Sequence, residues 1–458
     1  MQEKAIIREE IEKLKKYAVS HIIPHYASNE ELAREPKIFT TGEGCYVYDI
    51  QGKKYIDTFA SLLTTICGHH RPEIKKAVVE QMDKLEFWPN YFDQFTLPLI
   101  ELAKKLEEIM PGDLGVSFFV NSGSEANETA IKMARQYHRE NGQPHRYKIV
   151  ARKYSYHATT LGGTSCTGIP WFREYFEPLI PGAAFAPPAR CCECELELKY
   201  PDCKLACLKA MEKLIQWEGP DSISAVIMDP IPGSNIGYPL PPDGYLKGVR
   251  ELCDKYGILL IFDEVQTGFG KTGKWFACEH WDVVPDIMSI GKGFTGGYIP
   301  LGATVATHKV GDVFTKPGKE FRSGSTYGGH TLACAATLAN IKIIQDENLV
   351  ERAATTGKYL KERLEQLYKY SIVGDIRGIG MLWAVELAAN RETKKKLDTK
   401  LDIGTFIRRW CWDNGMILRN NGDILVYAPA LIINKEEIDL MVDLTEKAIQ
   451  AVIKHYGF

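Results

Sequence analysis

Reactive side chains follow two predicted strands of this 458-residue chain. Residues 258–262, Ile-Leu-Leu-Ile-Phe, form an apolar run of strand length that ends directly at Asp263. Such a carboxylate lies at the C-terminal edge of a sheet, where open α/β sheets bind their ligands. Taken alone, the pattern fits a carboxylate that caps the next loop equally well.

The second strand, at 287–290, is followed by Lys292 between two glycines. An isolated lysine after a strand is usually a surface residue. Glycine on both sides favours another interpretation, because it lets the backbone turn tightly and leaves the amine accessible to a cofactor.

The third segment, Ser122-Gly123-Ser124, is predicted to lead from a strand at 116–120 into a helix over 125–139. The free N–H groups and the dipole at the start of a helix form a phosphate cradle. A plain helix cap, with Ser124 as the capping residue, fits the same turn equally well.

Together, the anion cradle, the buried Asp263 and the glycine-flanked Lys292 predict pyridoxal 5′-phosphate bound as a Schiff base to Lys292. Once substrate displaces it, Lys292 moves a proton between the substrate Cα and the C4′ carbon of the cofactor. Asp263 pairs with the pyridine nitrogen and keeps it protonated, so that the ring accepts electrons. Ser122, Gly123 and Ser124 hold the phosphate.

Strands and helices alternate around these segments. Further apolar runs of strand length lie at 148–151, 223–228 and 303–306, and a helical pattern spans 244–256. This alternation predicts an α/β fold with a mostly parallel sheet. After residue 332 the pattern changes to helices at 332–345 and 349–367, short strands within 376–387 and a last helix at 435–455.

We therefore expect three parts. Residues 1–65 form an N-terminal segment that packs with the small domain, residues 66–332 the large cofactor-binding α/β domain, and residues 333–458 a smaller α+β domain. A hairpin is predicted where strands at 45–49 and 54–57 flank Gln51-Gly52.

The composition limits the class of protein. With 45% hydrophobic residues and a net charge of -3, the chain is neither disordered nor a typical nucleic-acid binder. No segment approaches the roughly 20 apolar residues of a membrane span. Residues 1–17 are charged and amphipathic, which predicts a surface helix rather than a signal peptide, and so a cytoplasmic protein.

A competing motif is Gly268-Phe-Gly-Lys-Thr-Gly273, which matches Gly-x-Gly-x-x-Gly and, with Lys274, nearly matches a nucleotide P-loop. A P-loop needs Ser or Thr where Trp275 stands, and neither pattern is followed by a clear helix. A nucleotide-binding protein is therefore the less favoured alternative.

The order of the motifs resembles the class III (omega) aminotransferases, which have the aspartate aminotransferase fold, fold type I, of enzymes that bind pyridoxal 5′-phosphate. The resemblance covers nearly the whole chain from about Gly42, and the matching segments are Ser122-Gly-Ser-Glu-Ala-Asn127, Tyr156-His157, Asp263-Glu-Val-Gln-Thr-Gly268, Ile290-Gly-Lys-Gly293 and Ser325-Thr-Tyr-Gly-Gly329.

The resemblance implies a role for further residues. Tyr156 stacks on one face of the cofactor ring, Val265 packs against the other, and His157 belongs to the same site. Thr326 reaches the phosphate of the neighbouring subunit, so that the functional unit is a homodimer or a dimer of dimers. Without the other motifs, an ordinary aromatic residue of the core would be the preferred interpretation of Tyr156.

The implied activity is a ping-pong transamination from an amine or omega-amino acid to a 2-oxo acid, with pyruvate as the expected acceptor. An aminomutase, an epimerase or a decarboxylase on the same cofactor and fold is the alternative. Arg419 resembles the mobile arginine of the family, which forks onto a substrate carboxylate. A surface arginine beside the Asn420-Asn421-Gly422 turn is its alternative.

Three other positions bear on the substrate. Leu63 stands in a segment where family members specialised for pyruvate and arylamines often have Trp, which predicts a differently shaped pocket wall. Trp88 belongs to an aromatic cluster with Phe87, Tyr91 and Phe92, which lines the pocket or forms part of the core. Asp229 begins Asp-Pro-Ile-Pro-Gly, where relatives commonly show Glu-Pro-x-Gln-Gly.

Five of the twelve cysteines crowd together between positions 191 and 207. Cys191-x-x-Cys194 and Cys203-x-x-x-Cys207 form two close pairs, a spacing typical of a small structural site for zinc or an iron–sulfur cluster. A disulfide and free thiols stay open as alternatives.

Overall fold

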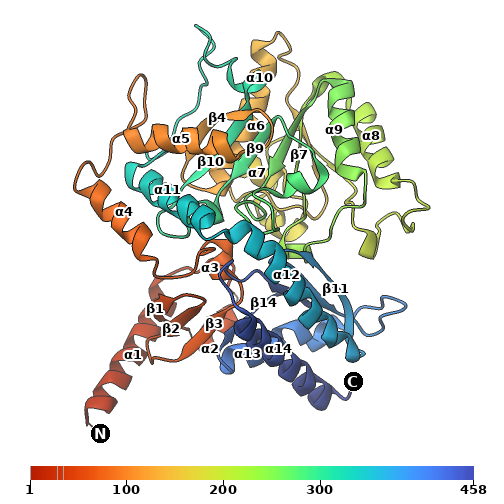
Figure 1. Ribbon diagram of the computed structural model, residues 1–458. Helices are drawn as coiled ribbons and strands as arrows, with labels where there is room; N and C mark the ends of the chain where they lie inside the picture. Colours follow the sequence, from red (N-terminus) through yellow and green to blue (C-terminus); the bar gives the residue numbers. More distant parts are fainter. Residues whose placement is uncertain (1, 28, 35) are drawn as a thin grey trace.

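The computed structural model describes residues 2–27, 29–34 and 36–458, without the side chains of 2–8, 29, 33 and 34. Its largest element is a seven-stranded sheet in the order β4-β10-β9-β8-β7-β5-β6 (Figure 1). These strands are β4 (Leu114–Val120), β5 (Lys148–Arg152), β6 (Ala183–Ala186), β7 (Ile223–Met228), β8 (Leu259–Asp263), β9 (Ile287–Ile290) and β10 (Gly302–Thr307). Only β10 runs antiparallel to its neighbours, so the prediction of a mostly parallel sheet is confirmed.

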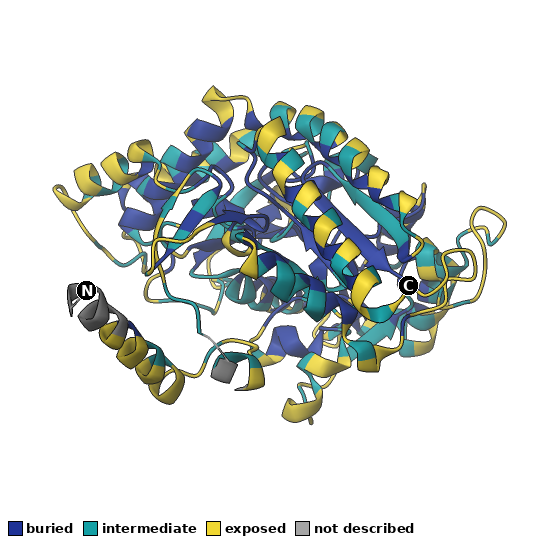
Figure 2. Cartoon of the chain, turned by 90° about the horizontal axis from the view of Figure 1, so that it is seen from below, coloured by how far each residue is buried: buried dark blue, intermediate teal, exposed yellow. Residues whose placement is uncertain are grey.

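Helices surround this sheet. They are α4 (Pro72–Met82), α5 (Leu97–Ile109), α6 (Gly123–Glu140), α7 (Leu161–Ser165), α8 (Ala206–Glu218), α9 (Tyr245–Tyr256), α10 (His308–Gly311) and α11 (Thr331–Asp346). Some are in direct contact with the sheet, and others, such as α4 on α11 and α7 on α6, are packed on another helix. Every residue of β7, β8 and β9 is buried, as is typical of parallel strands that are covered on both faces. Figure 2 shows this buried centre beneath exposed helix faces.

A second, antiparallel sheet has the order β11-β12-β15-β14. Its strands are β11 (Val373–Ile379), β12 (Leu382–Leu387), β14 (Arg419–Asn421) and β15 (Ile424–Tyr427). The helices of this part of the chain are α12 (Leu349–Glu365), α13 (Ile403–Asp413) and α14 (Lys435–Tyr456). Helix α14 begins with a capping box, in which Asn434 and Glu437 bond each other's backbone N–H groups. The helices and strands predicted after residue 332 are thus confirmed.

The N-terminal part comprises α1 (Gln2–His21), α2 (Asn29–Arg34), β1 (Phe39–Glu43), β2 (Tyr46–Asp49) and β3 (Lys54–Asp57). The predicted hairpin is β2-β3, and β3 pairs in parallel with β13 (Met416–Ile417). This pairing joins the N-terminal sheet to the C-terminal part of the chain, as Figure 1 shows. The domain limits at 65 and 332 stay predictions.

A left-handed turn follows β3. The segment α3 (Ala60–Leu63) has positive φ at all four residues, between 44° and 68°. Non-glycine residues rarely adopt this conformation, so surrounding contacts must hold it in place. The backbone N–H groups of Ser61 and Phe59 both donate to the Asp57 carboxylate, which supplies part of that support.

Short 3-10 turns complete the chain: η1 (Pro170–Phe172), η2 (Glu174–Phe176), η3 (Cys191–Glu193), η4 (Pro220–Ser222), η5 (Ser234–Ile236), η6 (Ala277–Trp281), η7 (Lys292–Thr295), η8 (Gln366–Lys369) and η9 (Thr399–Leu401). None of the helices in the described ranges is both long enough and apolar enough to cross a membrane.

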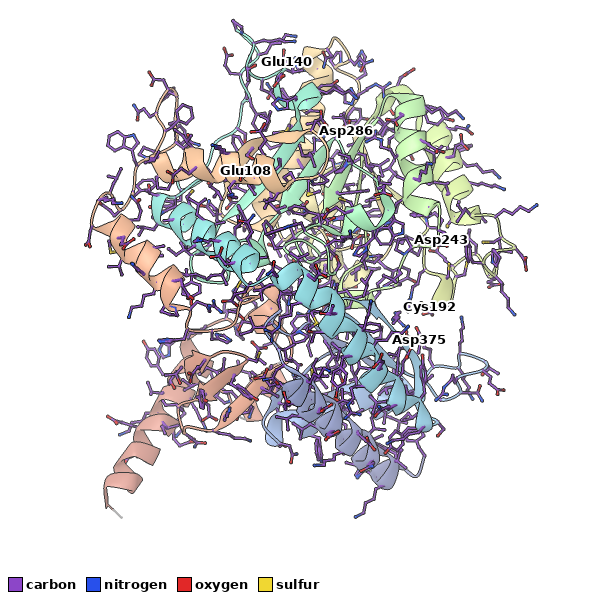
Figure 3. The ribbon with its side chains drawn as sticks, viewed as in Figure 1. Glu108, Glu140, Cys192, Asp243, Asp286 and Asp375 are labelled. Atoms are coloured by element: carbon purple, nitrogen blue, oxygen red, sulfur yellow. The ribbon has the colours of Figure 1, made fainter. Side chains whose placement is uncertain are left out.

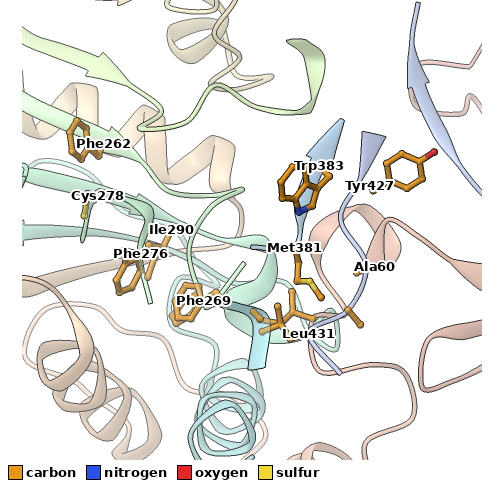
Figure 4. Packing of buried hydrophobic residues seen from close by; sticks show 14 of the residues in the cluster. Ala60, Phe262, Phe269, Phe276, Cys278, Ile290, Met381, Trp383, Tyr427 and Leu431 are labelled. Carbon is orange, nitrogen blue, oxygen red and sulfur yellow. The ribbon is translucent and has the colours of Figure 1, made fainter. Parts of the chain in front are cut away.

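One hydrophobic core joins the two larger sheets. Figure 4 shows Phe269 and Phe276 on the side of the seven-stranded sheet, with Met381 and Leu431 from the C-terminal part close by. Phe269 also stacks on Phe294, next to Lys292, with ring centroids 5.2 Å apart. The buried hydrophobic residues between the two sheets therefore form one continuous cluster.

Candidate functional site

Asp263 ends β8 at the C-terminal edge of the large sheet and is only 7% exposed. Its Oδ2 accepts hydrogen bonds from Asn127 Nδ2 at 2.8 Å and from His157 Nδ1 at 2.9 Å. Its Oδ1 accepts one from the backbone N–H of Val265 at 3.1 Å. The loop-capping alternative is thus present through one oxygen, while the other faces donors from α6 and from the segment after β5.

Asn127 is the site residue that the sequence reasoning missed as a functional side chain. It is fully buried on α6, one helical turn after Gly123, and its Nδ2 also donates to the carbonyl oxygen of His157 at 2.6 Å. The signal was available, because a polar residue inside the apolar stripe of a helix needs a buried partner.

Lys292 follows β9 and begins η7 with a φ of +49°. Its amine has no hydrogen-bond partner among the described residues. Burial lowers the pKa of Lys292 to about 8, with Asp263 raising it and Arg419 lowering it further. A half-buried amine with such a pKa is available as a nucleophile and as a base near neutral pH.

The backbone around Lys292 meets the start of α6. A Cβ on Gly291 would lie 3.2 Å from the backbone of Gly123, and a Cβ on Gly123 would lie 2.7 Å from the Val265 side chain. The absence of side chains lets the three segments approach each other. The structure therefore brings Lys292, Asp263 and the 122–124 turn together, as the sequence predicted.

The cap of α6 is Ser122 and not Ser124. Ser122 Oγ accepts from Glu125 N at 3.2 Å, and the helix begins at Gly123. The alternative with Ser124 as the cap is therefore wrong, because its hydroxyl instead accepts from Thr159 N at 3.2 Å. The first-turn N–H groups of Gly123 and Ser124 lack carbonyl partners within the helix and are free for an anion.

The 325–329 motif lies beside this turn. Asn121 Nδ2 donates to Ser325 Oγ at 2.7 Å, and Thr326 next to it is exposed on the chain's own surface. Its position leaves the hydroxyl free to meet another molecule.

Tyr156 and Val265 both lie near Asp263. Tyr156 is partly buried, and its ring lies 4.8 Å from that of Phe172. Burial raises the pKa of its phenol, and the charges of Asp263 and Arg419 act on it as well. The Val265 side chain lies against Gly123 at the start of α6.

Arg419 begins β14, and its guanidinium lies 5.3 Å above the Phe59 ring. Burial lowers its pKa, and no carboxylate of the described residues pairs with it. Its charge acts on both Lys292 and Tyr156. The alternative of a surface arginine does not fit this environment.

Asp229 pairs with Arg152 and not with Arg419. Its Oδ1 accepts from the fully buried Arg152 at 2.6 Å and from Ser155 Oγ at 2.8 Å, and its Oδ2 accepts from Gly233 N at 3.1 Å. Both oxygens of this short acid are therefore occupied away from Arg419.

Leu63 and Trp88 have different surroundings. Leu63 is buried in a cluster with Phe59 and Tyr238, close to the ring beneath Arg419. Trp88 is 48% exposed, and its indole N–H donates to Gln94 at 2.9 Å. No described contact joins it to the other candidates, so a single chain does not place Trp88 in the site.

The cysteine cluster lies at the edge of the molecule, where Figure 3 labels Cys192 near Asp243 and Asp375. All twelve cysteines carry free thiols, so the structure has no disulfide there. Among the described residues, no group of three or more His, Cys, Asp and Glu side chains is arranged to hold a metal. Burial, and after it the neighbouring thiols of Cys207, Cys203, Cys194 and Cys192, raise the pKa of Cys191. The zinc or iron–sulfur site and the free thiols therefore both stay predictions.

The Gly268–Gly273 turn is part of the interior. Lys271 is buried, and its Nζ donates to the carbonyl oxygens of Ala428 at 2.9 Å and Pro429 at 2.7 Å. The next element is the short turn η6 rather than a helix. Both facts argue against the nucleotide-binding alternative.

The residues fit pyridoxal 5′-phosphate. An amine without a partner stands opposite a carboxylate with a free lone pair, and the open start of α6 meets them where any Cβ on Gly123 or Gly291 would intrude. An aldehyde, a ring nitrogen and a phosphate are the groups that such a donor set accepts.

Known proteins similar to this chain are aminotransferases. Residues 27–449 match the family model for aminotransferase class-III. The chain is 35% identical to a putrescine–pyruvate aminotransferase of Pseudomonas aeruginosa, over 94% of both chains. It is 37% identical to an adenosylmethionine-8-amino-7-oxononanoate aminotransferase of Geobacter sulfurreducens, over 91% of this chain and 93% of the other. The omega transaminase from Pseudomonas jessenii in complex with PMP superposes with a TM-score of 0.93 at 32% identity, over 97% of this chain and 99% of that one.

Proposed function

Because the chain belongs to the class III aminotransferases, we propose that it moves an amino group from an amine or omega-amino acid to a 2-oxo acid by a ping-pong mechanism. The observation that carries this proposal is the convergence of Lys292, Asp263 and the start of α6 at one sheet edge. Membership of the family supports pyridoxal 5′-phosphate as the cofactor.

When bound, pyridoxal 5′-phosphate supplies an aldehyde that captures amines and a ring that accepts electrons. The N–H groups of Gly123 and Ser124 hold its phosphate, and Asp263 accepts from its ring nitrogen. Tyr156 and Val265 enclose the two faces of the ring. His157 does not reach the ring through its Nδ1, which is bonded to Asp263, and so acts by orienting that carboxylate.

Lys292 has two tasks in this proposal. Its amine would hold the cofactor before substrate arrives. Afterwards it would take the proton from the substrate Cα and deliver it to the C4′ carbon of the cofactor. A pKa of about 8 suits both tasks, because protonated and unprotonated forms are both populated near neutral pH.

Arg419 provides the affinity for carboxylates. This guanidinium is partly buried and has no acidic partner among the described residues, so a bound anion would stabilise its charge. It therefore suits the carboxylate of a 2-oxo acid or of an omega-amino acid. Because Asp229 is bound to Arg152, that acid does not compete with the substrate. Pyruvate is the proposed acceptor, and the name of the Pseudomonas aeruginosa relative supports it.

A homodimer is the proposed unit. Thr326 and Trp88 are exposed, and the same region presents further large apolar side chains to solvent, namely Leu62, Phe92, Phe95, Leu97 and Ile100. Apolar surface of this extent is typical of a subunit interface. The cytoplasmic location stays a prediction.

The test is a panel of a monoamine, a diamine and an omega-amino acid against pyruvate and 2-oxoglutarate. We expect amine to be consumed in equal amount with 2-oxo acid, and each half-reaction to be visible in the absorbance of the enzyme. Turnover without an acceptor would instead indicate an aminomutase or epimerase, and release of carbon dioxide a decarboxylase. Full turnover by Lys292→Ala would refute the proposal.

A further inference from the structure

We propose that Asn127 is a positioning residue, whose amide orients the Asp263 carboxylate so that one lone pair of Oδ1 is left for the ring nitrogen of the cofactor. The inference rests on the proposed function, because it assigns the partner of Asp263. It concerns a side chain that lies behind the carboxylate and does not touch the cofactor.

The hydrogen bonds of Asp263 divide unequally between its two oxygens. Oδ2 receives Asn127 Nδ2 at 2.8 Å and His157 Nδ1 at 2.9 Å, which fills both of its in-plane lone pairs. Among the described residues, Oδ1 accepts a hydrogen bond only from the Val265 N–H, at 3.1 Å. One acceptor position therefore remains on the carboxylate, and it belongs to Oδ1.

The orientation of the Asn127 amide follows from its neighbours. Its Nδ2 lies 2.6 Å from the His157 carbonyl oxygen and 2.8 Å from Asp263 Oδ2, and both of these atoms only accept. Rotating the amide by 180° would place its oxygen against two acceptors. The nitrogen is thus fixed, and with it the donor that faces Asp263.

This arrangement leaves two buried polar atoms without partners, Asn127 Oδ1 and His157 Nε2. Each unsatisfied buried group disfavours the folded state. A network that served only to stabilise the fold would gain from satisfying them. Here the hydrogen bonds are concentrated on one carboxylate oxygen, as expected of a network that orients Asp263.

His157 alone does not hold Asp263 in this way. Its Nδ1 must carry the proton, because Asp263 only accepts, and its ring position depends on the backbone that Asn127 holds through the His157 carbonyl oxygen. Asn127 therefore acts on the carboxylate twice, once directly and once through His157. Without it, the carboxylate turns more freely about χ2, out of the plane in which a lone pair faces the ring nitrogen, and this weakens the bond to that nitrogen.

The experiment compares Asn127→Leu, which keeps the size and removes the donor, with Asn127→Ser, which keeps a shorter donor. Equilibrium dialysis of the apoprotein measures affinity for pyridoxal 5′-phosphate, and a pH titration follows the visible absorbance of the loaded enzyme. We expect Asn127→Leu to bind the cofactor about tenfold to a hundredfold more weakly, as for loss of a hydrogen bond to a charged group. Asn127→Ser should lose less.

The pH midpoint of the visible band should also rise in Asn127→Leu, because the positive charge of the ring nitrogen holds this midpoint down. Loss of a purely structural residue would lower the thermal unfolding temperature of the apoprotein but leave the midpoint of the remaining loaded enzyme unchanged. An unchanged midpoint and affinity in both variants would overturn the inference.

A double-mutant comparison tests whether Asn127 acts through Asp263. In the Asp263→Asn background the direct target of Asn127 is altered, so adding Asn127→Leu should move the midpoint no further. An additional shift of equal size would contradict the assignment. If the unaltered protein bound no cofactor, the proposed function would fail. Normal cofactor chemistry with an insensitive Asn127 would refute the inference alone.

Discussion

Replacing Arg419 by Met tests whether its guanidinium is a carboxylate receptor. Met has a similar length and no charge, so the change removes the proposed fork while filling most of the space. Among the described residues Arg419 has no acidic partner to be left unpaired, unlike Arg152, which pairs with Asp229. The effect on substrates is therefore not mixed with the loss of an internal ion pair.

The expected magnitude follows from the bonds that the fork makes. A hydrogen bond to a charged group contributes about 1.5–3 kcal/mol, and a forked pair makes two of them. Removing this half-buried cation also removes the desolvation cost that the guanidinium carries in the enzyme without substrate, which offsets part of that loss. We take about 3 kcal/mol as the net effect, which corresponds to roughly 150-fold in kcat/KM for 2-oxo acids.

The assay measures single half-reactions by absorbance with pyruvate, an omega-amino acid and an uncharged monoamine. The two carboxylates should lose reactivity by the same factor, and the monoamine by less than about threefold. Arg419→Lys is the matched control, since it keeps the charge but not the planar fork. Its reactivity with the two carboxylates should lie between that of Arg419→Met and that of the unaltered enzyme. An equal loss for the monoamine and for pyruvate would refute the reasoning.

Other predictions concern stability and pH. Asp229→Asn leaves the buried Arg152 without its anion and should cost about 3–5 kcal/mol of unfolding free energy, whereas removing the exposed Asp221 from its pair with Arg146 should cost less than about 1 kcal/mol. Denaturant titration compares them, and equal losses would contradict the assigned burial. The rate at which the apoprotein takes up pyridoxal 5′-phosphate should rise with pH with a midpoint near 8, as the Lys292 amine loses its proton, and a midpoint near 10.5 would count against its burial. Burial lowers the pKa of Lys271 to about 7, below its unfolded value of 10.5, so the unfolded chain binds more protons between these limits and stability should increase as pH rises from 7 to 10.5. Lys271→Met should flatten this increase in thermal unfolding temperature, and an unchanged slope would show that Lys271 is not its source.

The sequence predicted most strands of the large sheet, because buried parallel strands such as β7 and β8 read as short continuous apolar runs. It did not predict α8, which begins within the cysteine-rich segment. That helix buries only Met211 and Ile215 along a narrow stripe. A sequence window with so few buried positions carries a weak helical signal.

At the site, the apolar runs placed Lys292 and Asp263 at the ends of neighbouring strands, as the structure has them, but the hydrogen-bond partners were not predictable. The bond between Asn127 and Asp263 joins residues 136 positions apart, and that between Arg152 and Asp229 joins residues 77 apart. Such pairs depend on which strands lie next to each other, a property that local spacing does not encode. The choice of Ser122 over Ser124 as the cap depended on where the chain leaves β4, and helix boundaries are uncertain by one or two residues from sequence alone.

Helix α6 serves both ends of the proposed cofactor. In the proposed site its first turn would face the phosphate, and Asn127, four residues or about 6 Å further along the axis, donates to the acid that would pair with the ring nitrogen. The two ends are thus set against one rigid element, whereas Arg419 belongs to β14 in the other sheet. A rotation of that sheet would therefore change the distance between Arg419 and the residues proposed to hold the cofactor, without moving Asn127 relative to the first turn of α6.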